Sequence, residues 1–395
     1  MHNQFDQSRS SSQLDPSQLS VFPCFMPDEP CVDRIVQWIN DAKKSIMIQA
    51  YKFSSIKIAN ALINAKKRRV RVEMLIDKNA KSKEDSLIEK LNNNGIYIKV
   101  DGGYGKAHNK VMIIDDERVI TGSYNWTDER YYYDSDVIVF INDECVNNKF
   151  KDNYEFINNQ EYTYKSGYDH SYLNLLHNSG YNPCGAPCDT MLSRDQPRLY
   201  QFISYNMTDE DGFTQYIPKE KKKKEKSKDY NVEINACFPR YNNQDCIKLI
   251  SNCINNAQKS VYIQSYSLTH EDIFNSLIYS YRKNVDIKIL TNEEAFQDSA
   301  QKIHDLVREG IEVKYEITND SGNAHSKTII IDDNIVLTGS MNLSKNAQKY
   351  NLENLLSIKN IYVNTMFKKH FCKKWNENLR QNSLPTIPEP GCIVS

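Results

Sequence analysis

Apolar and polar positions along this chain predict an alternating order of helices and strands. Three predicted helices occupy 31–42, 56–67 and 86–94, and a fourth is expected to end near residue 158. Gly95 follows the third helix, and glycine is a usual helix stop. The predicted strands occupy 45–51, 70–77, 96–100, 110–115, 118–121 and 136–141. This order of elements indicates an α/β fold.

The same order of segments recurs in the second half of the chain. The matching pairs are Lys44–Tyr51 with Lys259–Tyr266, Val70–Asp77 with Val285–Asn292, Gly95-Ile96 with Gly310-Ile311, Phe22-Pro23 with Phe238-Pro239, and Cys31 with Cys246. We therefore expect two duplicated lobes, each a mixed β-sheet flanked by helices, packed with approximate two-fold symmetry.

The repeat also predicts the organisation of the chain. We expect a disordered N-terminus (1–20), lobe 1 (21–158), an insert with a Lys-rich linker (159–230), lobe 2 (231–382) and a flexible tail (383–395). The run Lys219–Lys228 is read as a solvated linker, with contact to anionic lipid or nucleic acid as the alternative. The pair Cys184 and Cys188, with His170 and His177 nearby, is only a weak zinc pattern.

Composition describes an ordinary globular protein. Hydrophobic residues make up 39% and charged residues 26% of the chain, so each lobe has enough apolar residues for a core. With 50 basic and 51 acidic residues the formal net charge is -1, which argues weakly against a dedicated nucleic-acid binder. A neutral protein can nevertheless carry a locally positive groove.

The spacing of the cysteines and the polarity of the first residues indicate the cellular compartment. The ten cysteines show no regular framework, and the first 18 residues are polar rather than apolar. We therefore expect no signal peptide and reduced thiols in a cytosolic setting. No stretch is long and apolar enough to span a bilayer.

One motif, H-x-K-x4-D-x6-G-S-x-N, occurs once in each half with identical spacing. Its members are His108, Lys110, Asp115, Gly122, Ser123 and Asn125 in the first copy, and His325, Lys327, Asp332, Gly339, Ser340 and Asn342 in the second. Two such sets can build one metal-independent site for phosphodiester cleavage. One His attacks phosphorus, the other protonates the leaving oxygen, and Lys and Asn hold the phosphate oxygens.

The chain resembles the phospholipase D superfamily, whose pattern is this motif. The run Gly122–Thr127 is most similar to the branch of mitochondrial cardiolipin hydrolases and small bacterial endonucleases. The resemblance implies that His108 is the nucleophile and His325 the acid and then the base, although the near-symmetry of the sequence cannot decide this order. No cofactor and no metal are required, and Ser123 and Ser340 are expected to assist.

The resemblance also assigns roles to four acidic residues. Asp136 follows His108, and Glu353 follows His325, at the same spacing of 28 residues. In the family an acid at this position hydrogen-bonds the His of its own motif and orients the ring. Asp115 and Asp332 are expected to be structural, fixing the turn after each His/Lys strand.

The C-terminal residues Cys392-Ile393-Val394-Ser395 match a C-a-a-X pattern of the farnesylated type. One such chain gives only marginal membrane attachment, so a second signal would be needed. The N-terminal membrane helix usual in the cardiolipin hydrolases has no counterpart in the sequence. We expect a cytoplasmic, peripherally membrane-associated protein, with the mitochondrial surface as an alternative.

The leading functional hypothesis is a phospholipase D-like phosphodiesterase that hydrolyses phospholipid of the cardiolipin or phosphatidylcholine type through a phosphohistidine. The expected partners are phospholipid and a membrane surface. The alternatives are a metal-independent endonuclease on DNA or RNA and an inactive binding protein. An apolar rim would favour lipid and a continuous basic track would favour nucleic acid. With both motifs in one chain, no dimer is needed for activity.

Overall fold

The computed structural model describes residues 20–160 and 232–377, apart from 79, 81–86, 104, 129–131, 317, 319–321 and the side chains of 293–300. Nearly all of the predicted disordered N-terminus and of the predicted linker, and the whole of the predicted tail, lie outside these residues. So do the lysine run 219–228, the Cys184–Cys188 pair and the predicted lipidation residue Cys392.

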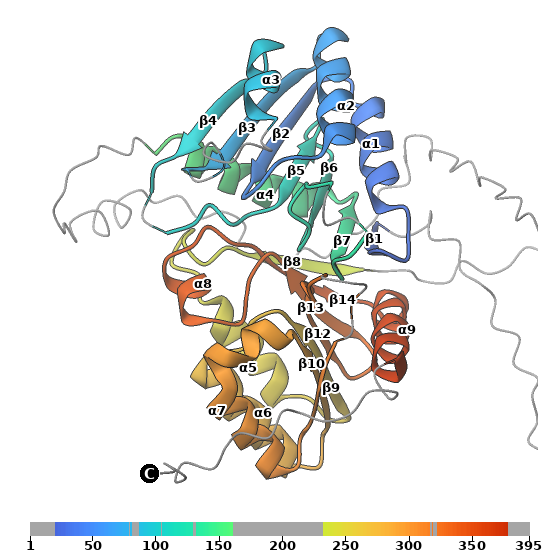
Figure 1. Cartoon of the computed structure of the whole chain (residues 1–395), viewed down its shortest axis with the longest axis vertical. Helices are drawn as coiled ribbons and strands as arrows, with labels where there is room; N and C mark the ends of the chain where they lie inside the picture. Colours follow the sequence, from blue (N-terminus) through green and yellow to red (C-terminus); the bar gives the residue numbers. More distant parts are fainter. Residues whose placement is uncertain are drawn as a thin grey trace, which may run out of the picture.

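Lobe 1 is a seven-stranded sheet with helices on both faces (Figure 1). Its elements are β1 (Val21–Phe25), α1 (Cys31–Asp41), β2 (Ser45–Ala50), α2 (Ile56–Lys67), β3 (Arg71–Asp77), α3 (Ile88–Asn93), β4 (Tyr97–Asp101), β5 (Val111–Ile114), β6 (Arg118–Gly122), β7 (Val137–Ile141) and α4 (Glu144–Asn158). The strand order is β1-β7-β6-β5-β2-β3-β4, with β2, β3 and β4 parallel and the remaining pairs antiparallel.

Lobe 2 repeats this topology. Its elements are β8 (Glu233–Cys237), α5 (Cys246–Asn255), β9 (Ser260–Ser265), α6 (Glu271–Arg282), β10 (Asp286–Thr291), α7 (Glu293–Glu309), β11 (Glu312–Tyr315), β12 (Lys327–Ile331), β13 (Ile335–Gly339), α8 (Lys345–Lys349), β14 (Leu355–Lys359) and α9 (Ile361–Glu377). The order β8-β14-β13-β12-β9-β10-β11 matches lobe 1 strand for strand. The predicted α/β fold with duplicated lobes is therefore confirmed.

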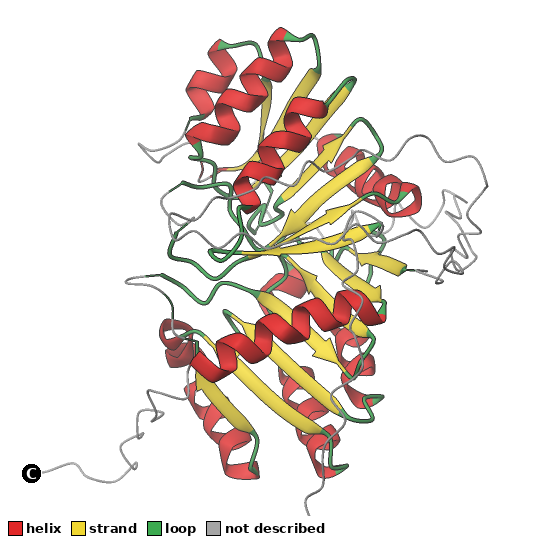
Figure 2. Ribbon diagram, turned by 90° about the vertical axis from the view of Figure 1, so that its right-hand side faces the viewer, coloured by secondary structure: helices red, strands yellow, loops and turns green. Residues whose placement is uncertain are grey.

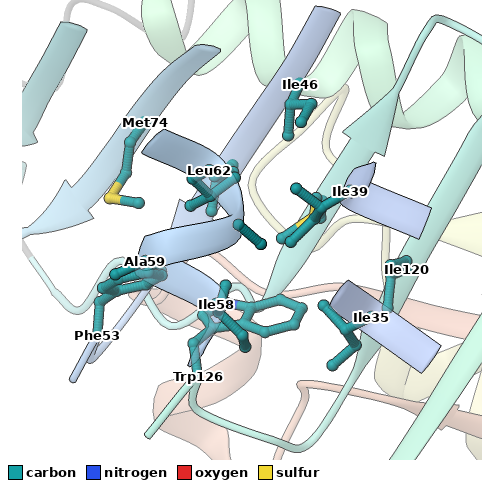
Figure 3. Packing of buried hydrophobic residues seen from close by; sticks show 14 of the residues in the cluster. Ile35, Ile39, Ile46, Phe53, Ile58, Ala59, Leu62, Met74, Ile120 and Trp126 are labelled. Atoms are coloured by element: carbon teal, nitrogen blue, oxygen red, sulfur yellow. The ribbon is translucent and has the colours of Figure 1, made fainter. Parts of the chain in front are cut away.

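The helices are stabilised by polar capping residues at the start of several of them and by apolar stripes that pack against the sheet. Ser55 accepts a hydrogen bond from the backbone N–H of Ile58 at the start of α2, as Asp143 does from Val146 in α4. The stripe of α1, which includes Ile35 and Ile39, faces α2 and the sheet (Figure 3). These side chains are fully buried, so each contributes about 1.5–3 kcal/mol of apolar burial.

A second core joins the two lobes. Helix α4 of lobe 1 packs on β8 of lobe 2, where the rings of Phe150 and Phe238 lie 5.0 Å apart. The symmetric contact brings α9 onto β1, with Phe367 and Phe25 at 5.3 Å. Both are edge-to-face contacts, the arrangement that aromatic pairs favour. Figure 2 shows the two sheets stacked end to end, and this shared core fixes one lobe against the other.

The structure adds two strands that the sequence pattern did not predict and corrects one part of the repeat. Cys24 in β1 pairs with Ile138, and Cys237 in β8 pairs with Leu355, which stands at the equivalent place in lobe 2. The equivalent residues are therefore Cys24 and Cys237, rather than Phe22 and Phe238. Short strands at a sheet edge carry little periodic signal, which explains why both were missed.

The expectation of reduced thiols is wrong for four cysteines. Cys24 forms a disulfide with Cys31, and Cys237 with Cys246, at Cα separations of 5.7 and 5.8 Å. Each bridge ties the edge strand of its sheet to the first helix of its lobe. Disulfides of this kind persist in oxidising surroundings. In the part of the chain that the structure describes, no helix has both the length and the hydropathy to cross a membrane.

Candidate active site at the lobe interface

Backbone hydrogen bonds between the lobes place the two motifs side by side. The backbone N–H of His108 donates to Leu352 O of lobe 2, and that of His325 donates to Ser135 O of lobe 1, both at 3.0 Å. Each contact belongs to a short parallel bridge, one between Ala107 and Leu352 and one between Ser135 and Ala324. The two bridges are related by the repeat, so the histidines meet across the pseudo-two-fold axis.

Each histidine is oriented by a carboxylate of the other lobe. His108 Nδ1 lies 2.8 Å from Oε1 and 2.9 Å from Oε2 of Glu353, and His325 Nδ1 lies 2.9 Å from Asp136 Oδ1. The expected contact of each acid with the His of its own motif is therefore wrong. The acid-bearing segments lead into β7 and β14 next to the interface, so each carboxylate reaches across it more directly than back to its own lobe.

The motif serines hold these carboxylates. Ser123 Oγ donates to Asp136 Oδ1 at 2.5 Å, and Ser340 Oγ donates to Glu353 Oε2 at 2.6 Å. Gly122 and Gly339 make this approach sterically feasible, because an added Cβ would lie 2.1 Å from Val137 O and 2.4 Å from Asn354 O. Both glycines also have positive φ. Glycine and serine in the motif thus support the acids that orient the histidines.

The motif lysines are buried beneath the histidines. Lys110 Nζ donates to His108 O, and Lys327 Nζ donates to His325 O, both at 2.6 Å. In lobe 2 the strand starts at Lys327, whereas in lobe 1 it starts just after Lys110. Both histidines therefore lie in the segment that precedes the strand.

Two tyrosines that the sequence analysis did not single out contact the histidines of the site. The ring of Tyr51 lies 4.9 Å from the ring of His108, and that of Tyr266 lies 5.3 Å from that of His325. Lys110 and Lys327 lie 5.3 and 5.6 Å from the same two tyrosine rings. A signal for both was present, because each tyrosine ends the repeated strand segment in its lobe.

The motif asparagines each leave one buried polar atom without a partner. Asn125 Oδ1 and Asn342 Oδ1 are inaccessible to solvent and make no hydrogen bond within the described residues. The oxygen and nitrogen of an amide are interchangeable in such an assignment. A buried amide atom without a partner in both half-sites fits a role in holding a ligand such as a phosphate group.

Burial sets the protonation of the site. It lowers the pKa of His108 to about 3 and that of His325 to about 4, with Lys110 and Lys327 adding to the effect. Burial also lowers the pKa of Lys110 well below its usual range and that of Lys327 to about 8. Both imidazoles are therefore neutral near pH 7, so each can donate from Nδ1 to its carboxylate and keep a lone pair on Nε2.

The two acids stay ionised in spite of burial, which by itself raises a carboxyl pKa. His325 and Ser123 hold the pKa of Asp136 below its ordinary value, and His108 does the same for Glu353. Negative carboxylates beside neutral imidazoles favour the tautomer with a proton on Nδ1. The nitrogen that remains for chemistry is Nε2 in both residues.

The remaining motif acids lie at the opposite end of the His/Lys strands. Asp115 accepts the backbone N–H groups of Lys43, Lys44 and Ser45 at 2.6 to 3.1 Å. Asp332 does the same for residues 258–260. These bonds tie the turn after each strand to the neighbouring strand, and neither acid reaches the histidines. No cluster of three potential metal-ligating side chains occurs among the described residues.

The comparisons with known proteins agree with this architecture. The profile described as "Cardiolipin synthase, PLD-like domain" matches residues 35–157 and 250–375, one segment in each lobe. The phospholipase D of Rickettsia prowazekii (strain Madrid E) is 37% identical over 145 residues, which is 37% of this chain and 70% of the relative. The mitochondrial cardiolipin hydrolase of Xenopus laevis is 26% identical over 140 residues, 35% of this chain and 67% of that protein.

A solved structure extends the likeness to both lobes. The phosphatidylserine synthase of Haemophilus influenzae Rd KW20 superposes with a TM-score of 0.60 at 14% identity, over 92% of this chain and 86% of that one. At this identity the likeness concerns the fold alone. The two matched segments and the duplicated topology together establish that this chain belongs to the phospholipase D-like family of phosphodiesterases.

Proposed function

We propose that this chain hydrolyses the head-group phosphodiester of a phospholipid at a membrane surface, through a phosphohistidine intermediate and without a metal ion. The observation that carries the proposal is the pair of imidazoles, each fixed by a buried carboxylate of the opposite lobe. Such a pair can supply both a nucleophile and a proton donor on the two sides of one phosphorus atom.

In the first step His108 Nε2 attacks phosphorus while the bond from phosphorus to the head-group oxygen breaks. His325, in its protonated form, gives its Nε2 proton to that oxygen, and the head-group alcohol leaves. Lys110, Lys327 and the two motif asparagines stabilise the negative oxygens of the five-coordinate phosphorus. The phosphatidyl group remains bonded to His108.

In the second step His325 acts as base. Its Nε2 takes a proton from water, the water oxygen bonds to phosphorus, and the bond between phosphorus and His108 breaks. Phosphatidic acid leaves, His108 is neutral again, and His325 carries the proton needed for the next cycle. All proton transfers use side chains of this chain.

Two features support lipid as the substrate. The relatives are named phospholipase D and cardiolipin hydrolase. In addition, Tyr132 and Tyr133 are 66% and 39% exposed and lie just before Asp136 in the chain. Tyrosine suits the boundary between water and lipid because its ring is apolar and its hydroxyl is polar.

The test is an assay of purified protein in EDTA against short-chain cardiolipin, short-chain phosphatidylcholine, single-stranded DNA and RNA in parallel. We expect release of phosphatidic acid from at least one lipid, and no loss of activity on chelation. Cleavage of the polynucleotides alone would replace the lipid assignment by a metal-independent endonuclease. No cleavage of any of the four would favour an inactive binding protein.

A further inference from the structure

The two half-sites are alike in their reacting groups but differ in the charge around them. Around the ring of Tyr51, beside His108, three ammonium groups lie within 6 Å, those of Lys110 at 5.3 Å, Lys106 at 5.6 Å and Lys52 at 5.8 Å. Beside His325, the ammonium group of Lys327 lies 5.6 Å from the ring of Tyr266.

The repeat shows that this difference is built into the sequence. The positions equivalent to Lys52 and Lys106 are Ser267 and Asn323, both uncharged. At these two positions the His108 half-site therefore carries positive charges that the His325 half-site lacks. Like charges around an imidazole disfavour its protonated form, so they favour a neutral His108.

In a second pair of equivalent residues, Asp134 and Asn351, the charged member is negative and belongs to the His325 half-site. Asp134 precedes Ser135, whose carbonyl accepts the backbone N–H of His325, and Asp134 Oδ1 accepts the backbone N–H of Asn323 at 2.7 Å. Its counterpart is Asn351, which precedes Leu352 beside His108. A carboxylate thus stands next to the His325 half-site where the His108 half-site has a neutral amide.

Asn351 also acts on the acid that orients His108. Its Nδ2 donates to Glu353 Oε1 at 3.1 Å, and its Oδ1 accepts the backbone N–H of Lys106 at 3.2 Å. Glu353 therefore receives a donor that Asp136 cannot receive from Asp134, since an ionised aspartate has no proton to donate. An additional donor makes Glu353 a weaker acceptor for the proton of His108.

We propose that Asp134 and Asn351, together with Lys52 and Lys106, are positioning residues that give the two imidazoles unequal proton affinities, so that His108 attacks phosphorus and His325 carries the proton. This inference rests on the proposed function and assigns a physical origin to the division of roles between two nearly symmetric halves. Among the described residues, the other charged groups that act on the imidazoles include Glu353, Asp136, Lys110 and Lys327, and these are matched between the halves.

The first experiment measures the pH dependence of kcat/KM, using a dispersed short-chain phospholipid and four variants. Asp134→Asn keeps an oxygen that can accept the Asn323 N–H but removes the negative charge beside His325. The pH at which kcat/KM falls on the alkaline side should therefore decrease by about half a unit or more. In Asn351→Asp, and in the double variant Lys52→Ser/Lys106→Asn, the pH at which kcat/KM falls on the acidic side should increase, because His108 is protonated more easily. Asp333→Asn, an exposed acid paired with Lys259 and Lys368, is the matched control and should move neither limb.

The second experiment identifies the phosphorylated residue by rapid quenching and peptide mapping. Wild-type protein should carry the phosphoryl group on His108. The inference is overturned if the phosphoryl group is found on His325. It is also overturned if the kcat/KM profiles of all three test variants fall at the same acidic and alkaline pH as that of Asp333→Asn. Unlike these outcomes, a wild-type protein that cleaves no phosphodiester would overturn the proposed function itself. A variant that unfolds is recognised by its melting curve, and the remaining variants then decide.

Discussion

Glu353 of the second lobe holds the Nδ1 atom of His108 of the first lobe at 2.9 Å, and this bond makes the two lobes one catalytic unit. The reverse bond runs from His325 to Asp136. Neither lobe contains a histidine together with the carboxylate that orients it. Duplication has therefore produced two halves that exchange their supporting acids, and the active site exists only where they meet.

The crossed pairing predicts which chemical step each acid serves. Glu353→Gln should slow formation of the phosphohistidine, because the amide no longer favours the correct tautomer of His108. Asp136→Asn should instead slow protonation of the leaving group and hydrolysis of the intermediate. Each loss of kcat should be about 10²-fold or more. Single-turnover kinetics with a slow phospholipid substrate separates the two steps, and the opposite assignment would contradict the crossed pairing together with the proposed order.

A mixing experiment tests whether one chain makes one site. His108→Ala and His325→Ala should each abolish turnover while substrate binding survives, since the phosphate ligands remain. An equimolar mixture of the two variants should stay inactive, because each chain lacks one of its two histidines. Recovery of activity in the mixture, checked by size-exclusion chromatography, would show that sites form between chains.

Much of the fold was accessible from the sequence because the repeat carried the signal twice. Periodicity predicted the buried strands and the helices, and the spacing of the motif identified the two histidines and two lysines that the structure brings to the lobe interface. The partner of each histidine was not accessible, since Glu353 lies 245 positions from His108 and only packing of the lobes brings them together. Spacing within one motif favours the wrong, same-lobe acid.

The disulfides show a different limit. Pairing Phe22 with Phe238 in the repeat conceals that Cys24 and Cys237 are equivalent. Alignment at the repeated Cys-Phe dipeptide would have revealed two cysteines per lobe at similar separations. A short edge strand has too few residues for periodicity to fix such a register.

The acidity of the two histidines predicts an acidic optimum. Burial lowers their pKa values to about 3 and about 4, so the protonated imidazole that the leaving group needs becomes scarce as the pH rises. We expect kcat/KM to be greatest below pH 7 and to fall further above pH 8, where Lys327 loses its proton. A bound phosphate anion raises the pKa of a nearby imidazole, so the alkaline limb of kcat should lie at higher pH than that of kcat/KM. A maximum of kcat/KM above pH 8 would contradict this.

The same two histidines lower the free energy of unfolding in acid. The pH profile of kcat/KM therefore needs a folding control. A buried histidine with a lowered pKa contributes its full stability above the ordinary value near 6.5 and loses it as the pH falls towards the folded-state pKa. His370, stacked on Phe25 with its pKa lowered by burial to about 3, adds to this effect. Denaturant unfolding should therefore show decreasing stability below about pH 6. Activity at each pH is then compared with the folded fraction.

The two disulfides should stabilise the fold and, through one of the loops, the reaction. Closing loops of this size stabilises by about 2.5 kcal/mol each in the chain-entropy description. Within the loop from Cys24 to Cys31, the backbone N–H of Met26 donates to Asp136 O at 2.9 Å. Replacing both cysteines by serine should therefore lower the melting temperature and also reduce kcat, because Asp136 orients His325.

The matched control is Cys372→Ser, which removes an exposed free thiol of α9 and leaves both bridges in place. It should change neither the melting temperature nor kcat by more than a small fraction of the effect in Cys24→Ser/Cys31→Ser. Reductant opens both bridges, so in wild-type protein it should reduce kcat and lower the melting temperature at least as far as Cys24→Ser/Cys31→Ser does. If mass analysis under non-reducing conditions finds these four cysteines as thiols, the bridges do not form and the stability argument fails. If the bridges form but kcat survives their loss at temperatures where the protein stays folded, the Met26 contact has no part in holding Asp136.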